Sequence, residues 1–256
     1  MPGRPYILAE AALSQTNGVD WNVAVLPWGA TEPHNFHLPY GTDSYQAADV
    51  AAESARRAWE AGARVTVLPV VPFGVNTQQM GTTLAINMNP STQAIVLEDV
   101  VASLEHHGVQ KLVVLNGHGG NHFRQMIREL QARTEVFLCT IDWYKVVPYE
   151  GYFDEPGDHA GELETSMMQH LAPTLVHDLS VAGPGDARVF RLRAMQEGWA
   201  WAPRDWKQVT DDTGVGNPAA ATPQKGQRYM DAVCAEIGTF LIELAATHPD
   251  DMYGTR

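Results

Sequence analysis

Basic residues are scarce in this chain of 256 residues, which has 17 lysines and arginines against 30 aspartates and glutamates. The formal net charge of −13 at pH 7 argues against a nucleic-acid partner, because phosphate binding depends on clustered lysine and arginine. No apolar run approaches the roughly 18 residues that span a bilayer, so we expect no membrane association. With 45% hydrophobic and 18% charged residues, the composition is typical of a globular protein with a substantial core.

Cysteine is also nearly absent, which excludes a disulfide-rich scaffold. Cys139 lies in an apolar strand-like run and Cys234 in an amphipathic helix-like run, so both are interpreted as buried free thiols. Residues 1–20 lack a basic start followed by an apolar core, so we expect no signal peptide. These features predict a cytoplasmic protein. The length most simply predicts a single domain over residues 1–256, with two small domains as the alternative.

Apolar strand-like runs alternate with helical periods along most of the chain. Strands are expected at residues 22–27, 64–71, 111–115 and 136–142. Helices are expected at 43–61, 91–107 and 224–246, and a further helix follows residues 116–121 and ends at about residue 133. Ser91 is a plausible N-cap, and a short hairpin is expected around residues 189–192. The alternation predicts an α/β fold, a three-layer α/β/α sandwich around a mostly parallel sheet. Such sheets bind ligands beyond the carboxyl ends of their strands.

Five of the ten histidines lie in three short polar blocks that also carry carboxylates, asparagines or glycines. The blocks cover residues 32–43, 116–122 and 158–166. Imidazole and carboxylate are the groups that bind first-row divalent metals. Because the blocks are far apart in the sequence, the pattern predicts one metal site that is assembled by folding.

The first block supplies Glu32, His34 and Asp43. The two oxygens of Asp43 suit a bridge between two ions, and paired metals about 3.5–4 Å apart recur in hydrolases. The alternative is a polar loop shaped by Pro33 and Pro39 in which the histidines make only local hydrogen bonds.

The second block, NGHGGN at residues 116–121, falls between an expected strand and an expected helix. Its glycines permit tight turns and close approach to a ligand. A phosphate-binding loop is the competing interpretation, but the block lacks the spacing of known phosphate loops and has an imidazole at its centre. His118 is therefore a candidate ligand, whereas His122 is interpreted as a helix-face residue.

The third block offers His159, Glu162 and Glu164, with Asp158 before them. On a helix His159 and Glu162 would share one face. The alternative is a solvated helix start with Asp158 as the N-cap. A structural zinc site is disfavoured, because such sites usually use cysteine and neither cysteine lies in a block.

These blocks resemble the motifs of the creatininase (creatinine amidohydrolase) family. Residues 29–43, GATEPHNFHLPYGTD, resemble the family pattern G-[SA]-x-E-x-H-G-x-H-L-P-x-x-T-D. NGHGGN is intact, as is H-A-G-x-x-E-T-S at residues 159–166, and a weaker tail motif ending in Lys225-Gly226 follows at residues 214–226. The matches keep the family order and span most of the chain.

The resemblance implies a hydrolase with two divalent metal ions per chain. Glu32 and His118 would hold one ion, His34 and Glu162 the other, and Asp43 would bridge them. A bridging water would be the nucleophile. His159 would protonate the leaving nitrogen, and Glu164 would orient a ligand. A direct ligand role for His37 is disfavoured.

The implied reaction is hydrolysis of an amide C–N bond in a small, possibly cyclic substrate. Related activities on formamides, small peptides or oxidised inositols are alternatives, as is a non-catalytic phosphate-binding module. Asn35 replaces the motif's glycine, Gly120 replaces a glutamate of creatininase proper, and Glu155-Pro156 replace an expected aromatic residue. Mixed nitrogen and oxygen ligands suit zinc, manganese or iron. The resemblance also implies a homo-oligomer, a hexamer.

Overall fold

A computed structural model describes residues 3–255 of the chain. Four parallel strands form the central sheet in the order β2-β1-β3-β4, with β1 at Val23–Trp28, β2 at Val65–Val67, β3 at Lys111–Asn116 and β4 at Phe137–Asp142. Every residue of β1 and β3 is buried. Strands buried on both faces are typical of parallel sheets that are covered by helices on each side.

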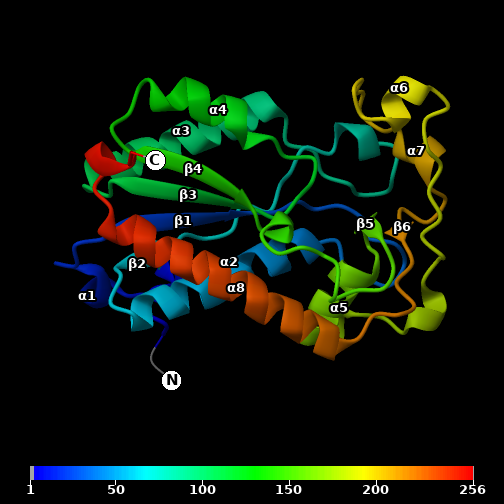
Figure 1. Ribbon diagram of the computed structural model, residues 1–256, viewed down its shortest axis with the longest axis horizontal. Helices are drawn as coiled ribbons and strands as arrows, with labels where there is room; N and C mark the ends of the chain where they lie inside the picture. Colours follow the sequence, from blue (N-terminus) through cyan, green and yellow to red (C-terminus); the bar gives the residue numbers. More distant parts are fainter. Residues whose placement is uncertain (1–2, 256) are drawn as a thin grey trace.

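Helices cover both faces of this sheet (Figure 1). On one face lie α2 (Thr42–Glu60) and α8 (Pro223–Ala246), and on the other lie α3 (Pro90–His106) and α4 (Phe123–Gln131). Two separate apolar clusters fill the spaces between the layers. The predicted three-layer α/β/α fold with a parallel sheet is confirmed.

The carboxyl ends of the strands point toward an end of the molecule that carries the remaining short elements (Figure 1). These are a two-stranded sheet of β5 (Gly157–His159) and β6 (Val215–Gly216), with α5 (Glu162–Leu171), α6 (Arg193–Gln196) and α7 (Trp206–Val209). The short α1 (Leu13–Thr16) lies near the other end.

Helices α5 and α8 pack closely because α8 has a glycine at the contact. A Cβ atom on Gly226 would meet the backbone oxygen of Ser166 at 2.0 Å. Pro223 opens α8, and the Thr222 side chain accepts from the Lys225 amide as its N-cap. The Lys-Gly end of the tail motif therefore sits where α8 crosses α5.

Three local predictions were wrong. The second strand is shorter than residues 64–71, because β2 ends at Val67 and Val71 returns to β1 only as an isolated bridge to Trp28. Asn89, not Ser91, is the N-cap of α3, since Pro90 takes the first helical position. Residues 189–192 form no hairpin in the described chain and lie in an irregular segment with exposed apolar side chains.

In the described residues no helix is both long enough and apolar enough to cross a membrane.

Candidate metal centre

The three polar blocks meet beyond the carboxyl ends of β1 and β3. Glu32 and His34 lie in the loop after β1, Asp43 in the first turn of α2, His118 just after β3, His159 at the end of β5 and Glu164 in the first turn of α5. All are buried except Glu164, whose side chain is 17% exposed. Three groups among the described residues bring nitrogen and carboxylate oxygen atoms within 4.8 Å of one another. The groups are Glu32-His34-His159, Glu32-Asp43-His118 and His34-Asp43-Glu164.

Each of the three histidines uses one ring nitrogen to bind a backbone carbonyl. The contacts are His34 Nδ1 to Glu32 O at 3.0 Å, His118 Nε2 to Val75 O at 3.1 Å, and His159 Nε2 to Pro33 O at 3.0 Å. A carbonyl oxygen only accepts, so each of these nitrogens carries a proton and donates it. The opposite nitrogen of each ring is thereby turned toward the carboxylates, the arrangement that fixes histidine ligands in metal sites.

The two inward-facing nitrogens nearest the carboxylates lie on either side of Asp43. Nδ1 of His118 is 3.0 Å from Oε1 of Glu32 and 3.0 Å from Oδ2 of Asp43. Nε2 of His34 is 3.0 Å from Oδ1 of Asp43 and 3.9 Å from Oε1 of Glu164. Asp43 therefore presents one oxygen to each side, as a carboxylate that bridges two ions would.

The outer oxygens of Glu32 and Glu164 are held by donors outside the histidine cluster. Oε2 of Glu32 accepts from the side chain of Gln79, and Oε2 of Glu164 accepts from the amide of Ala160. Within residues 3–255, Oε1 of Glu32 and Oδ2 of Asp43 are buried, and both face Nδ1 of His118 at 3.0 Å. Buried charges in proteins are either paired or coordinated to a metal. These two oxygens fit a bound cation.

The charges at this site strongly perturb its histidines. Burial alone disfavours a charged ring at His34, but the negative charges of Asp43, Glu164 and Glu32 outweigh it and raise the pKa of His34 to about 10. The same balance, with Glu32 and Asp43 opposing burial, raises the pKa of His118 well above its ordinary value. In the metal-free protein, protons on these rings balance the buried carboxylates, and a divalent cation replaces such protons when it binds.

Asparagines brace the NGHGGN loop that carries His118. Oδ1 of Asn116 accepts from the His118 amide at 3.1 Å and from Nδ2 of Asn121 at 3.0 Å. Oδ1 of Asn121 accepts from the Val75 amide at 3.1 Å, which holds the segment whose carbonyl binds His118. A Cβ atom on Gly120 would lie 2.4 Å from both His118 Nε2 and Val75 O, so only glycine leaves the hydrogen bond between these two atoms undisturbed.

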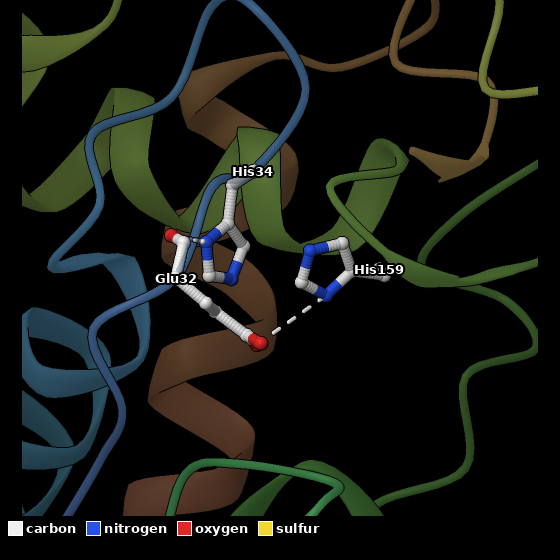
Figure 2. Close-up of side chains that lie close together, drawn as sticks. All are labelled: Glu32, His34 and His159. Carbon is white, nitrogen blue, oxygen red and sulfur yellow. Dashed lines mark hydrogen bonds and ion pairs between the residues drawn. The ribbon is translucent and has the colours of Figure 1, made fainter. Parts of the chain in front are cut away.

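His159 lies at the rim of the centre, and Figure 2 shows its ring beside His34 with Glu32 below. The two rings stack with their centroids 4.2 Å apart, and the Trp206 ring packs edge-on to His159 at 4.7 Å. Nδ1 of His159 is 3.7 Å from Oε1 of Glu32. The expectation that His159 and Glu162 share a helix face is wrong, because His159 ends β5 and α5 begins only at Glu162.

Glu162 belongs to none of the three groups, although it lines the same pocket. Its Oε2 accepts from the amides of Asp154 and Glu155, both at 2.7 Å, and its Oε1 contacts Nζ of Lys225. Both oxygens are therefore engaged away from the histidines. Glu164, which occupies the glutamate position of the H-A-G-x-x-E-T-S motif, takes the place beside His34 and Asp43.

Two other histidines of the blocks lie outside the centre. His37 is fully buried and bonds Oγ1 of Thr165 at 2.8 Å, and burial lowers its pKa to about 4. His122 is exposed at the start of α4. Sequence reasoning missed Gln79 and Val75, which contact Glu32 and His118 from a segment without any histidine or carboxylate.

A pocket of about 550 Å³ opens onto the centre, within the size range of ligand sites. Glu32, Asp43, His118, His159 and Glu164 line its floor. Trp143, Tyr144 and Tyr149 also line the pocket. They provide aromatic side chains, whereas the sequence has Glu155-Pro156 where the family resemblance led us to expect an aromatic residue.

An α/β/α fold with buried carboxylates and oriented histidines at the carboxyl ends of its strands is typical of metal-dependent enzymes. Residues 10–241 match the model of the family described as Creatininase: Creatinine amidohydrolase, and the chain belongs to the creatininase family. The predicted membership is confirmed.

Relatives within the family act on different substrates. A crystal structure from Bacteroides fragilis, provisionally assigned as a creatinine amidohydrolase, has a TM-score of 0.92 and 41% identity over 98% of this chain and 99% of that one. A mycofactocin precursor peptide peptidase of Mycobacterium ulcerans is 26% identical over 82% of this chain and 80% of its own. A creatinine amidohydrolase of Pseudomonas putida is 28% identical over 60% of this chain and 66% of its own. Membership thus defines a metal-dependent hydrolase and leaves the substrate open.

Proposed function

We propose that this protein is a dinuclear metal-dependent amidohydrolase that cleaves an amide C–N bond. The observation that carries the proposal is the position of Asp43, whose two oxygens each lie 3.0 Å from an oriented histidine nitrogen. A site with one ion would not need two such faces on one carboxylate.

We assign the ligands from these contacts. Glu32 and His118 hold one ion, His34 and Glu164 hold the other, and Asp43 bridges both. The change from the sequence-based assignment is Glu164 in place of Glu162, whose oxygens are engaged by Lys225 and two backbone amides. Zinc, manganese and iron all suit this mixed nitrogen and oxygen set.

When bound, two divalent ions supply Lewis acidity that lowers the pKa of water and polarises a carbonyl group. His159 supplies the proton chemistry. Its Nε2 donates to Pro33 O, so Nδ1 faces the pocket, where it would accept the proton that the attacking water loses and pass it to the leaving nitrogen.

The pocket supports a substrate class wider than creatinine. Its volume of about 550 Å³ is in the range that holds drug-sized ligands, and its rim carries Glu150, Glu155 and Asp158. A small cyclic amide remains the first candidate, with formamides, short peptides and keto-inositols as alternatives. The peptide alternative has the support of the mycobacterial relative.

The test is hydrolysis of a substrate panel by protein loaded with zinc or manganese. The panel contains creatinine, N-formyl compounds, short peptides and a keto-inositol. His159→Gln is expected to lose at least about 100-fold in kcat and to keep its metal. His122→Gln is the matched control, because this histidine is exposed and outside the centre. Turnover by His159→Gln at the wild-type rate, or no turnover of any amide by the loaded protein, would contradict the proposal.

We further propose that the protein is a cytoplasmic homo-oligomer, a hexamer. Both cysteines are free, which suits a reducing compartment. Exposed apolar side chains gather on residues 189–201, on either side of α6, where Val189, Leu192, Trp199 and Trp201 are each more than 60% exposed. Sedimentation velocity distinguishes a hexamer from a monomer, and a monomer at all concentrations would refute this assembly.

A further inference from the structure

Thr213, which lies just before the tail motif, has a strained backbone conformation that none of the sequence motifs predicts. Its φ of +64° lies in the left-handed region, which is unfavourable for a β-branched residue. The neighbouring Asp212 fixes this turn. Its buried carboxylate accepts from the Thr210 hydroxyl at 2.8 Å, the Gly214 amide at 2.8 Å and the Gly185 amide at 2.9 Å. Because the hydrogen bonds of Asp212 hold Thr213 in this strained conformation, we expect Thr213 to have a functional role.

The Thr213 hydroxyl brackets the backbone of His34. It accepts from the Asn35 amide at 2.9 Å and donates to the Pro33 carbonyl at 3.3 Å, one bond on each side of His34. Asn35 reinforces the link from the same loop. Its side chain donates to Gly183 O at 3.0 Å and accepts from Gly183 N at 2.8 Å.

The same carbonyl holds the ring of His159. Pro33 O accepts from His159 Nε2 at 3.0 Å, shorter than its bond from Thr213. The backbone of His159 pairs with Val215, two residues beyond Thr213. The segment that contains Thr213 and Val215 therefore holds His159 in two ways. Val215 pairs with its backbone, and Thr213 binds the Pro33 carbonyl that accepts from its ring.

Glycines let these segments approach closely. A Cβ atom on Gly214 would lie 2.9 Å from Nδ2 of Asn35, and one on Gly216 would lie 2.7 Å from Cα of Gly157. Asn35 itself has a φ of +55°, which asparagine tolerates better than most residues. The glycine pair at the start of the tail motif is explained by this packing.

We propose that Thr213 is a positioning residue for His159. Its hydroxyl fixes the Pro33 carbonyl, the carbonyl keeps the ring proton on Nε2, and Nδ1 is thereby presented to the metal centre. This role rests on the proposed function of His159 in proton transfer, but the ring orientation itself is measurable without any substrate.

The first experiment is long-range ¹H–¹⁵N NMR of zinc-loaded protein with ¹⁵N-labelled histidine, with His159 assigned from its absence in His159→Gln. Thr213→Val removes the hydroxyl and keeps the β-branched shape. Thr213→Gly also removes it and accepts the positive φ without strain, so it serves if the valine variant fails to fold. Thr213→Ser retains the hydroxyl. Leu84→Gly is the matched control, since Leu84 has a φ of +56° and is 74% exposed.

Wild type, Thr213→Ser and Leu84→Gly are expected to show one His159 tautomer, protonated at Nε2. Thr213→Val and Thr213→Gly are expected to exchange that proton with water at least about 10-fold faster. On any amide that the wild type hydrolyses, both should lose about 10–100-fold in kcat with KM within about twofold, the usual effect of removing a group that orients a site residue. An unchanged Nε2 proton in both hydroxyl-free variants would overturn the proposal. If the panel gives no turnover, the proposed function fails, and the NMR result still decides the role of Thr213.

Discussion

Exchanging Glu162 and Glu164 for glutamine separates a structural carboxylate from a ligand carboxylate. At Glu162 one oxygen faces two backbone N–H groups and the other faces the Lys225 ammonium group. The amide of Glu162→Gln must turn its own NH₂ group toward one of these donors. We therefore expect the fold to lose stability while the metal content stays unchanged.

The size of the expected loss of stability depends on the polar partners that Lys225 retains in the variant. Removing one partner of a buried ion pair typically costs about 3–5 kcal/mol. Lys225 is 22% exposed and retains Asp154 at 2.7 Å and Ala220 O at 3.0 Å, so we expect about 2–3 kcal/mol here. For a domain of this size each kcal/mol lowers Tm by about 2–4 °C, which gives a fall of about 4–12 °C.

Glu164→Gln should give the opposite result. Its glutamine can still accept from the Ala160 amide, so the free energy of unfolding of the metal-free protein should change by less than about 1 kcal/mol. Metal content should fall from about two ions to about one. Thermal melts of chelated protein and elemental analysis of loaded protein measure both effects. Loss of metal in Glu162→Gln, with two ions retained in Glu164→Gln, would refute this assignment.

Three further changes test the centre. Asp43→Asn should bind less than about one ion per chain by elemental analysis, because both sites lose charge, and two retained ions would exclude the bridge. Gly120→Ala should weaken metal binding about 10–100-fold in chelator competition, since its Cβ displaces Val75 O from His118, and unchanged affinity would contradict this reason. In metal-free protein the pKa of His34 is raised above its unfolded value of about 6.5 to about 10. Its stabilising contribution is therefore complete below pH about 6.5 and lost as pH rises toward 10, so denaturant midpoints of chelated protein should fall over that range, and a rise would contradict the sign.

The fold was predictable from the sequence because its strands and helices have strong periodicity. β1 and the centre of β3, residues 112–115, are continuously apolar, and both strands appear with nearly the expected bounds. The shortening of β2 was not predictable, because the run 64–71 is apolar throughout much of its length, while the regular ladder to β1 ends at Val67 and resumes only as a bridge at Val71.

The candidate site was predictable where the motif itself carries the chemistry. Glu32, His34, Asp43 and His118 each lie in a block with flanking glycine or proline, and the structure brings them together. Glu162 and Glu164 were hard to separate, since two carboxylates two residues apart on α5 look equivalent until Lys225 is placed beside one of them. The motif position of Glu164 was the available signal.

The supporting contacts could not be predicted. Thr213 meets Pro33 and Asn35 across about 180 residues of sequence, and its hydroxyl carries no periodic or compositional signal. Gln79 reaches Glu32 from a 3₁₀ turn at Thr77–Gln79 that contains no histidine or carboxylate. Such contacts depend on the packed loops and not on local sequence.

The most direct test of the dinuclear centre is anomalous diffraction from crystals of the zinc-loaded protein. We expect two peaks about 3.5–4 Å apart, one on each side of the Asp43 carboxylate, with Glu164 and not Glu162 at the second. A single peak, or a second ion held by Glu162, would contradict the account.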